Sequence, residues 1–345
     1  RNSILSNGDH GIELHANHVI VERNEVAYNG SANIGTSGIH VFSATPDEDA
    51  ARHNVIRNNV VFGTYENFGP DGNGIELDHW AKDTEVYGNV LYGNSGQGFV
   101  AFRASDFRFY GNFVFDNMQS EAHLNFARPT EVFLGSFSVD PIDQVHDYTV
   151  FGNVIASSGT FSGSGSANIT ALLVDAPTIF LTRNIGANHY FNADGGSFYL
   201  WGFSPDELWG PGEAGTDIET WNALKQNGDP DVAGGVNMLE GSAVDGDDRT
   251  DLIQGTDQDD TLSGGGGRDV LIGSDGNDRL DGGGDADVMV GGRGDDVYFV
   301  SEPNDLVMEF PDSGADTVYS SGTYGLPSFV ENAVLLGEEI GRAHV

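Results

Sequence analysis

The C-terminal part of the chain carries aspartates at a regular nine-residue spacing. Five consecutive segments read GTDQDDTLS, GGGGRDVLI, GSDGNDRLD, GGGDADVMV and GGRGDDVYF. Their sixth residues are Asp260, Asp269, Asp278, Asp287 and Asp296, and their eighth residues are large and mostly apolar. Carboxylates beside glycine turns, where backbone carbonyls are accessible, are hard oxygen ligands of the kind that suits Ca²⁺. We expect a cation to hold these turns together, because closely spaced carboxylates otherwise repel one another.

The same spacing predicts how the turns stack. Each unit fits a glycine-permitted turn followed by a short strand whose eighth-position side chain points inward. If two units make one coil, Asp260, Asp278 and Asp296 line one edge, and Asp269 and Asp287 line the other. The expected calcium ligands are these five aspartates together with Gly264, Gly266, Gly273, Asp275, Gly282, Gly284 and Gly291. Thr256 and Ser274 replace the second glycine of the unit, and Gln258 and Asp285 replace the fourth, so we expect weaker binding at those turns.

A second group of residues could transfer protons. Nine of the ten histidines precede residue 190, in a part of the chain with short alternating segments after glycine: HGIELHA, SGIHVFS, NGIELDHW and QGFVAFRA. Alternation directs Ile12, Ile39, Ile75 and Phe99 inward and the residues between them outward. The outward acids and histidines, with two residues at the strand ends, are Glu13, His15, His40, Glu76, Asp78, His79 and Arg103, and His123 and Asn125 are expected from the next coil. Such a column suits a sugar acid, with arginine for the carboxylate and histidine or an acid for the proton.

Composition excludes several other classes. The chain has 345 residues, 53 of them acidic and 15 basic, for a formal charge of −38. This balance argues against nucleic acid or anionic membranes as partners and favours cations. There is no cysteine, and no apolar run approaches the roughly 20 residues of a membrane span. The segments HExxH, GxxxxGK[ST] and GxSxG are absent.

The elements that position the histidines and acids also repeat. VERNEVAYNG, VIRNNVVFG, EVYGNVLYGN, RFYGNFVFDN and TVFGNVIAS are short β patterns interrupted by asparagine or Gly-Asn. Short strands at a recurring period, with no helical pattern between them, indicate a stacked solenoid. We expect an asparagine ladder at one bend, formed by Asn24, Asn58 or Asn59, Asn89, Asn112 and Asn153, because asparagine tolerates left-handed backbone and its amide can bond between coils.

The nonapeptide segments resemble the RTX (repeats-in-toxin) family of calcium-binding β-rolls. The segment VYFVSEPNDLVMEFPDSGADTVYSSGTYGLPSFVENAVLLG resembles the flank that follows such repeats in secreted proteins. The resemblance implies an extracellular protein that binds Ca²⁺ and is exported by a type I secretion machinery.

The N-terminal part resembles right-handed parallel β-helix proteins. Joined to RTX repeats, it is similar to the secreted mannuronan C5-epimerases and some related alginate lyases, whose strand reads Tyr-Gly-Phe-Asp-Pro-His. HGIELH places Glu13 and His15 at the acid and histidine positions, and NGIELDHW places Glu76 at the acid position. The matches are partial, since Asp78 takes the position of the histidine and Phe42 or Phe102 that of a further aspartate.

The expected fold is all-β, a right-handed parallel β-helix followed by a calcium-binding parallel β-roll. The expected ranges are 1–205 for the β-helix, 206–250 for a closing cap and linker that includes one short amphipathic helix, 251–300 for the roll and 301–338 for its flank. Residues 339–345 resemble translated sequencing adapter and are left out of the fold.

Three functions fit these observations. The first is a secreted enzyme that acts on an acidic polysaccharide by C5 epimerisation or β-elimination. The second is a non-catalytic extracellular module for carbohydrate binding, adhesion or a matrix. The third is a glycoside hydrolase, for which paired acids such as Glu76 and Asp78 would serve.

Overall fold

The computed structural model describes residues 2–32, 35–66, 71–118, 130–135, 145–157, 170–175, 184–186, 188–192, 199–201, 232–233, 236–309, 313–327 and 329–336. Within these ranges the chain is all β, every strand pairs in parallel, and no helix is present. The chain divides into two compact units, Arg1–Gly234 and Gly235–Val345. Among the described residues no helix is long and apolar enough to cross a membrane.

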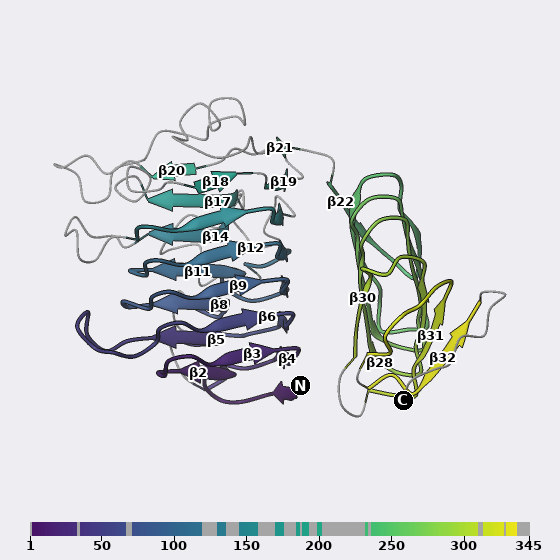
Figure 1. The fold of residues 1–345 in the computed structure, drawn as a ribbon, viewed down its shortest axis with the longest axis horizontal. Helices are drawn as coiled ribbons and strands as arrows, with labels where there is room; N and C mark the ends of the chain where they lie inside the picture. The colour runs from purple at the N-terminus through teal and green to yellow at the C-terminus, as the bar shows by residue number, and fades with distance from the viewer. Residues whose placement is uncertain are drawn as a thin grey trace. The chain divides into compact units, whose positions relative to one another are not determined.

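The first unit is a parallel β-helix in which successive coils stack on three sheets (Figure 1). The first sheet contains β1 (Ser3–Leu5), β4 (Glu25–Ala27), β7 (Val60–Phe62), β10 (Val90–Tyr92), β13 (Phe113–Phe115), β16 (Val154–Ser157), β19 (His189–Asn192) and β21 (Val232–Ala233). The second contains β2 (Ile12–Leu14), β5 (Ser37–Phe42), β8 (Asn73–Asp78), β11 (Phe99–Phe102), β14 (Thr130–Gly135), β17 (Thr170–Asp175) and β20 (Tyr199–Trp201). The third contains β3 (Ile20–Glu22), β6 (Val55–Arg57), β9 (Glu85–Tyr87), β12 (Arg108–Tyr110), β15 (Thr149–Phe151) and β18 (Asn184–Gly186).

The core of the β-helix is made of the inward residue of each short strand. Ile39 and Ile75 on the second sheet, Val86 on the third and Leu91 on the first are fully buried. Because side chains alternate along a strand, these inward residues fix which neighbours face away from the core. The predicted inward positions Ile39, Ile75 and Phe99 are confirmed.

One bend of the helix is held by the predicted asparagine ladder. Each asparagine accepts the backbone N–H of its counterpart one coil earlier, as in the 3.0 Å bond from Asn24 N to Asn59 Oδ1. The ladder consists of Asn24, Asn59, Asn89, Asn112, Asn153 and Asn188. Asn59 rather than Asn58 takes part, because Asn58 has a positive φ of 52° and turns the chain into the ladder.

A second ladder, which the sequence reasoning missed, lies at another bend. Thr64 N donates to Asn94 Oδ1, and Asn94 N donates to Asn117 Oδ1. It ends at Glu131, which is fully buried and accepts a 2.8 Å bond from Asn117 Nδ2. The coils are therefore joined at two bends by side-chain amides.

The second unit is a two-sheet parallel roll. One sheet contains β22 (Val236–Glu240), β24 (Thr250–Gln254), β26 (Val270–Asp275), β28 (Val288–Arg293) and β30 (Leu306–Met308). The other contains β23 (Ala243–Asp245), β25 (Thr261–Gly265), β27 (Arg279–Gly283), β29 (Val297–Val300), β31 (Thr317–Ser320) and β32 (Asn332–Leu335). Successive units alternate between the sheets, so units two apart pair, as predicted. The eighth-position residues are fully buried in its core: Leu262, Leu271, Leu280, Met289 and Tyr298.

The roll extends beyond its expected range of 251–300 at both ends. Residues 236–250, expected in the linker, form β22, β23 and the start of β24, which pair with the roll's own strands. The expected flank adds β30, β31 and β32 to the two sheets. The expected short helix within 206–250, and residues 339–345, lie outside the described residues.

Candidate functional site

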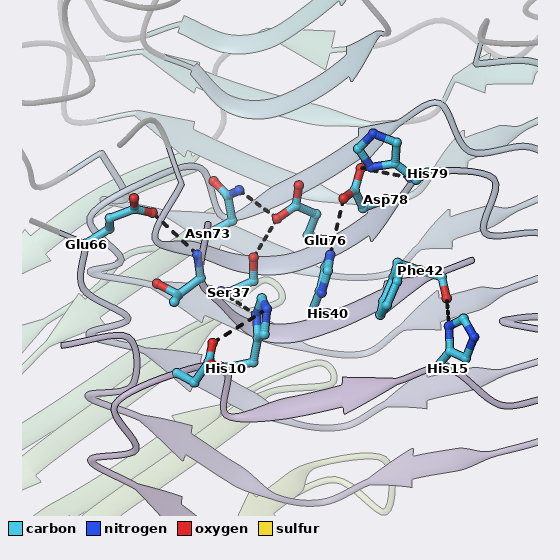
Figure 2. A network of polar contacts seen from close by, with 12 residues as sticks. His10, His15, Ser37, His40, Phe42, Glu66, Asn73, Glu76, Asp78 and His79 are labelled. Atoms are coloured by element: carbon cyan, nitrogen blue, oxygen red, sulfur yellow. Dashed lines mark hydrogen bonds and ion pairs between the residues drawn. The ribbon is translucent and has the colours of Figure 1, made fainter. Parts of the chain in front are cut away.

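The acids and histidines of the β-helix lie on the outer face of its second sheet. The register pairs Glu13 with His40, and His40 with Glu76, on successive strands β2, β5 and β8. Phe42 pairs with Asp78 in the same way. Figure 2 shows Glu76, Asp78 and His40 on neighbouring strands, with His79 beside Asp78. Strands β5 and β8, with the residue that follows β8, therefore place two carboxylates and two imidazoles close together.

Glu76 faces away from the core but is only 7% exposed. Its Oε2 accepts a 2.5 Å hydrogen bond from Ser37 Oγ and a 3.1 Å bond from Asn73 Nδ2. Burial raises the pKa of Glu76, and the nearby charge of Asp78 raises it further. This carboxyl therefore binds a proton at higher pH than an ordinary glutamate does.

Asp78 is held in the opposite state. Burial alone would raise its pKa, but hydrogen bonds from His40 and His79 outweigh it and lower the pKa to about 2. Asp78 Oδ2 lies 3.4 Å from His40 Nε2, and Asp78 Oδ1 lies 2.5 Å from His79 Nδ1. Burial would lower the pKa of His40, but the bond to Asp78 and the charge of Glu76 raise it overall. His40 thus keeps its proton to higher pH than an ordinary histidine, beside a carboxylate that stays ionised.

Two further residues of this cluster, His10 and Asp71, were not predicted from the sequence. The ring of His10 stacks on that of His40 with centroids 4.3 Å apart, and His10 Nδ1 accepts the N–H of Ser37 at 3.0 Å. Asp71 lies close enough to feel the charge of Glu76, and burial together with that charge raises its pKa to about 8. The available signal was the residue before the first strand glycine, which is His10, Ser37 or Asn73 in successive coils.

Other predicted residues lie at the margin of this cluster. Glu13 is exposed beside His40. His15 is held away by Phe42 O and by Glu48 Oε1, both at 3.0 Å from its ring nitrogens. Arg103 follows β11 with a positive φ of 56°, and its guanidinium lies 5.1 Å from the centroid of the Phe102 ring.

The coil after β11 does not continue the column as expected. The register pairs Glu76 with Val100 on β11, and Val100 with Phe133 on β14. The column that contains Glu76 therefore continues with apolar residues in the next two coils. His123 and Asn125 lie outside the described residues. His10, Glu13 and His40 could bring ligand atoms within 4.8 Å of one another, but the Nδ1 lone pair of His10 is already taken by Ser37 N–H.

The aspartates of the roll form two buried columns, as the nine-residue spacing predicts. Asp260 N donates to Asp278 Oδ1 and Asp278 N to Asp296 Oδ1, while Asp269 N donates to Asp287 Oδ1. These bonds are 2.7–2.9 Å long and join residues 18 apart. All five side chains are at most 2% exposed. Each column therefore carries a row of carboxylates inside the protein.

Most of these aspartates have one carboxylate oxygen without a donor. The Oδ2 atoms of Asp269, Asp278, Asp287 and Asp296 are buried and accept no hydrogen bond. Burial raises the pKa of Asp269 and Asp296 to about 8, with neighbouring carboxylates adding to it. A positive charge beside these oxygens is needed to keep them ionised at neutral pH.

The glycine turns supply further oxygens at the same places. A Cβ on Gly264 would overlap Asp269 Oδ2 and lie 2.6 Å from the carbonyl oxygen of Gly282. A Cβ on Gly273 would likewise overlap Asp278 Oδ2 and lie 2.6 Å from the carbonyl oxygen of Gly291. Carboxylate and carbonyl oxygens thus converge around a space that only glycine leaves open. This donor set fits Ca²⁺.

The remaining predicted ligands have other contacts. Asp260 Oδ2 already accepts the N–H of Thr256 at 2.6 Å. Asp275 faces Arg293 at 3.7 Å on the surface. Gly266 and Gly284 donate their N–H groups to carbonyls two turns earlier. Neither Asp260 nor Asp275 has a side-chain oxygen that is both buried and without a donor.

The columns also contain aspartates that the sequence reasoning missed. Asp251 N donates to Asp269 Oδ1, Asp287 N to Asp305 Oδ1, and Asp296 N to Asp316 Oδ1. Asp251 is the sixth residue of an overlooked nonapeptide, GDDRTDLIQ, which was recognisable by its period. Asp316 lies 20 rather than 18 residues after Asp296, so a strict period could not find it.

Comparisons with known proteins agree with this division. A model of the RTX calcium-binding nonapeptide repeat (4 copies) matches residues 245–276 and 263–298, and a model of the right-handed β-helix region matches residues 1–114. No curated protein and no solved structure matches the chain, so no comparison points to a mannuronan C5-epimerase. The chain thus joins a right-handed parallel β-helix to calcium-binding RTX repeats.

Proposed function

We propose that this chain is an extracellular, calcium-dependent enzyme that acts on an acidic polysaccharide by removing the C5 proton of a uronic sugar. The observation that carries the proposal is the cluster of Glu76, Asp78 and His40 on one outer face of the β-helix. Stacked parallel strands present a long, regular surface, which suits an extended polymer.

The separation of the acid and base roles supports this chemistry. Neighbouring groups with pKa values shifted in opposite directions are typical of acid–base pairs. Glu76 has a raised pKa and serves as the base, while Asp78 stays ionised and keeps the proton on His40. His40 then serves as the acid.

Both reactions begin with removal of the C5 proton and differ in where the electron pair goes next. Glu76 takes the C5 proton, and the electron pair of the C–H bond moves into the uronate carboxylate to form an enolate. In epimerisation the pair returns to C5, which takes the proton of His40 on the opposite face of the ring. In β-elimination the pair forms the C4–C5 double bond, the C4–O bond breaks, and the leaving oxygen takes a proton from His40.

Arg103 is the candidate group for the substrate carboxylate. Its guanidinium lies over the Phe102 ring, and that ring lies 5.6 Å from the ring of His79. A fixed positive charge at this border would hold a uronate and stabilise the enolate.

Export is part of the same proposal. RTX calcium-binding repeats are typical of secreted proteins, and we infer that this chain leaves the cell through a type I route. Calcium outside the cell would then be available to fold the roll.

The test is proton NMR of alginate, pectate and glucuronan incubated with the full chain and Ca²⁺ in D₂O. Deuterium at C5 identifies an epimerase, and new unsaturated uronate signals identify a lyase. Glu76→Gln should abolish either change. Glu85→Gln, a carboxylate on the third sheet, should leave it intact. A calcium-loaded, folded protein that alters none of the polymers would contradict the proposal.

A second candidate, a non-catalytic carbohydrate-binding module, is favoured by a different face. The rings of Tyr87, Tyr110 and Phe151 stack in register on the third sheet, with centroids 4.8 and 5.1 Å apart, and Phe151 is 42% exposed. Aromatic faces of this kind bind sugar rings. In that case Tyr110→Ala would weaken glycan binding, and Glu76→Gln would have no effect on it.

A further inference from the structure

The last turn of the roll departs from the glycine pattern at one position. Strand β28 pairs with β30 in a register that joins Val290 to Met308, so Glu309 lies one coil after Gly291. In the earlier coils of the same column this place is held by a glycine whose carbonyl faces the preceding coil, as Gly291 faces Gly273. Here the glutamate adds a side-chain carboxylate instead.

That carboxylate points into the roll rather than into solvent. Glu309 is 3% exposed, and its oxygens accept hydrogen bonds from Tyr298 Oη and, at 2.8 Å, from Ser313 Oγ. Ligand atoms of Asp296, Glu309 and Asp316 all lie within 4.8 Å of one another. Asp296 and Asp316 are 1% and 0% exposed. Three buried carboxylates therefore share one small region.

An independent observation marks this region as a ligand site. The Oδ2 atoms of Asp296 and Asp316 are buried and have no hydrogen-bond partner. Neither residue makes an ion pair within the described part of the chain. Their Oδ1 atoms are used by the aspartate column, in which Asp296 N donates to Asp316 Oδ1 at 2.8 Å. The free oxygens are thus left to face the carboxylate of Glu309.

The other column of the same roll ends differently. Asp305 Oδ2 accepts the backbone N–H groups of Ser301 and Glu302, at 3.2 and 3.0 Å. At the opposite end, Asp251 Oδ2 accepts the N–H of Asp247 at 2.8 Å. Those ends are satisfied by backbone amides, whereas the end formed by Asp296 and Asp316 is not.

We propose that Asp296, in the last nonapeptide, binds a divalent cation of the calcium type together with Glu309 and Asp316, which follow the repeats. Oxygen ligands of high negative charge suit a hard divalent cation, and the ion would neutralise carboxylates that are costly to bury unpaired. This site closes the column with a side-chain carboxylate where no repeat glycine remains. It is independent of the chemistry proposed for Glu76.

The test counts ions bound to the full chain by equilibrium dialysis with Ca²⁺, and it follows Tb³⁺ luminescence excited through tyrosine. Tyr298 donates to Glu309, so Tb³⁺ at this site lies beside a sensitising ring. Glu309→Gln should bind one ion fewer and lose most of the sensitised emission. The matched control is Asp305→Asn, which removes a buried carboxylate from the satisfied column and should leave the ion count unchanged.

Two results would overturn the proposal. If Glu309→Gln binds as many ions as the wild type with equal emission, the carboxylates are neutralised by protons instead. If that variant does not fold, Tyr298→Phe decides, because it removes the sensitising phenol without changing charge. Loss of the sensitised emission in Tyr298→Phe, with Tb³⁺ still bound, supports the site, and unchanged emission contradicts it.

Discussion

The two units of this protein solve the same geometric problem with two different side chains. In the β-helix, Asn59 N donates to Asn89 Oδ1 at 3.0 Å, one coil away. In the roll, Asp260 N donates to Asp278 Oδ1 at 2.8 Å, also one coil away. Both ladders are buried and join successive turns through one side-chain oxygen. They differ only in the second atom of the side-chain head group.

That second atom decides whether an ion is needed. The Nδ2 of Asn59 donates to Asn89 Oδ1 and to Val21 O, so the asparagine ladder satisfies itself. The Oδ2 of Asp278 can donate nothing and accepts nothing. An unpaired buried carboxylate is strongly unfavourable. The comparison shows why one unit is expected to fold without metal while the other depends on Ca²⁺.

The largest expected effect is that of calcium removal. Chelation should unfold the roll and leave the β-helix folded, because each ion present at about 100 times its Kd contributes about 2.7 kcal/mol of stability. Hydrogen exchange should show loss of protection in the amides of β24 to β29 and retained protection in β5 to β13. Equal loss of protection in both units would show that the β-helix also depends on calcium.

The next effect comes from exchanging the two ladder residues. Asn112→Asp removes the donor that bonds Val86 O and Asn153 Oδ1, both at 3.0 Å, and buries a charge. We expect a loss of about 3–5 kcal/mol in the free energy of unfolding, independent of calcium. The effect of Asp278→Asn on the stability of the roll should depend on calcium. The substitution should destabilise the roll when Ca²⁺ is present and stabilise it when Ca²⁺ is removed. Urea unfolding with and without chelator measures both effects. If Asp278→Asn changes the free energy of unfolding in the same direction in both conditions, the carboxylates of the roll do not depend on an ion.

A smaller effect is expected from replacing glycine by alanine, and it should differ between the two units. Gly264→Ala places a methyl against Asp269 Oδ2 and the Gly282 carbonyl, so it should remove calcium binding at that turn. Gly111→Ala meets no atom within 4 Å but has a φ of +61°, so it should cost only about 1 kcal/mol of backbone strain. Calcium titration by calorimetry distinguishes the two variants. If Gly264→Ala binds as many calcium ions as the wild type, the space between Gly264, Asp269 and Gly282 binds no ion.

The smallest expected effect concerns the proton on His40. Its pKa is raised from 6.5, so the stabilisation from its pairing with Asp78 is complete below pH 6.5 and is lost as pH rises through the raised folded value. Asp78→Asn should lower the pKa of His40, because burial then acts without the opposing carboxylate. NMR titration of the His40 ring measures the shift, and a pKa unmoved by Asp78→Asn would show that the pair does not set it.

Much of the fold was predictable because it rests on periodicity. Asp260, Asp278 and Asp296 share a strict spacing, and one register places them in a column. The looser repeats of the β-helix left Asn58 and Asn59 equivalent until the register selected Asn59. Insertions change the spacing without changing the stacking, which is why Asp316 escaped detection.

The candidate site was less predictable. Alternation placed Glu76 and His40 outward correctly, yet it could not show that Glu76 is buried or that His10 stacks on His40. Those contacts depend on how successive coils are offset. His15, predicted within the same column, is instead held by Glu48, which lies 33 residues away in the chain.

The sequence by itself determined the two repeating architectures and the identity of the ion, because a period, a glycine turn and a carboxylate are local properties. Only the tertiary structure decided which oxygens lack a donor and which carboxylates share a site. Asp260 and Asp278 look alike in the sequence, but the Thr256 amide satisfies Oδ2 of the first and no donor reaches Oδ2 of the second. Hydrogen-bond satisfaction is a property of the packed neighbours, and a linear spacing does not contain it.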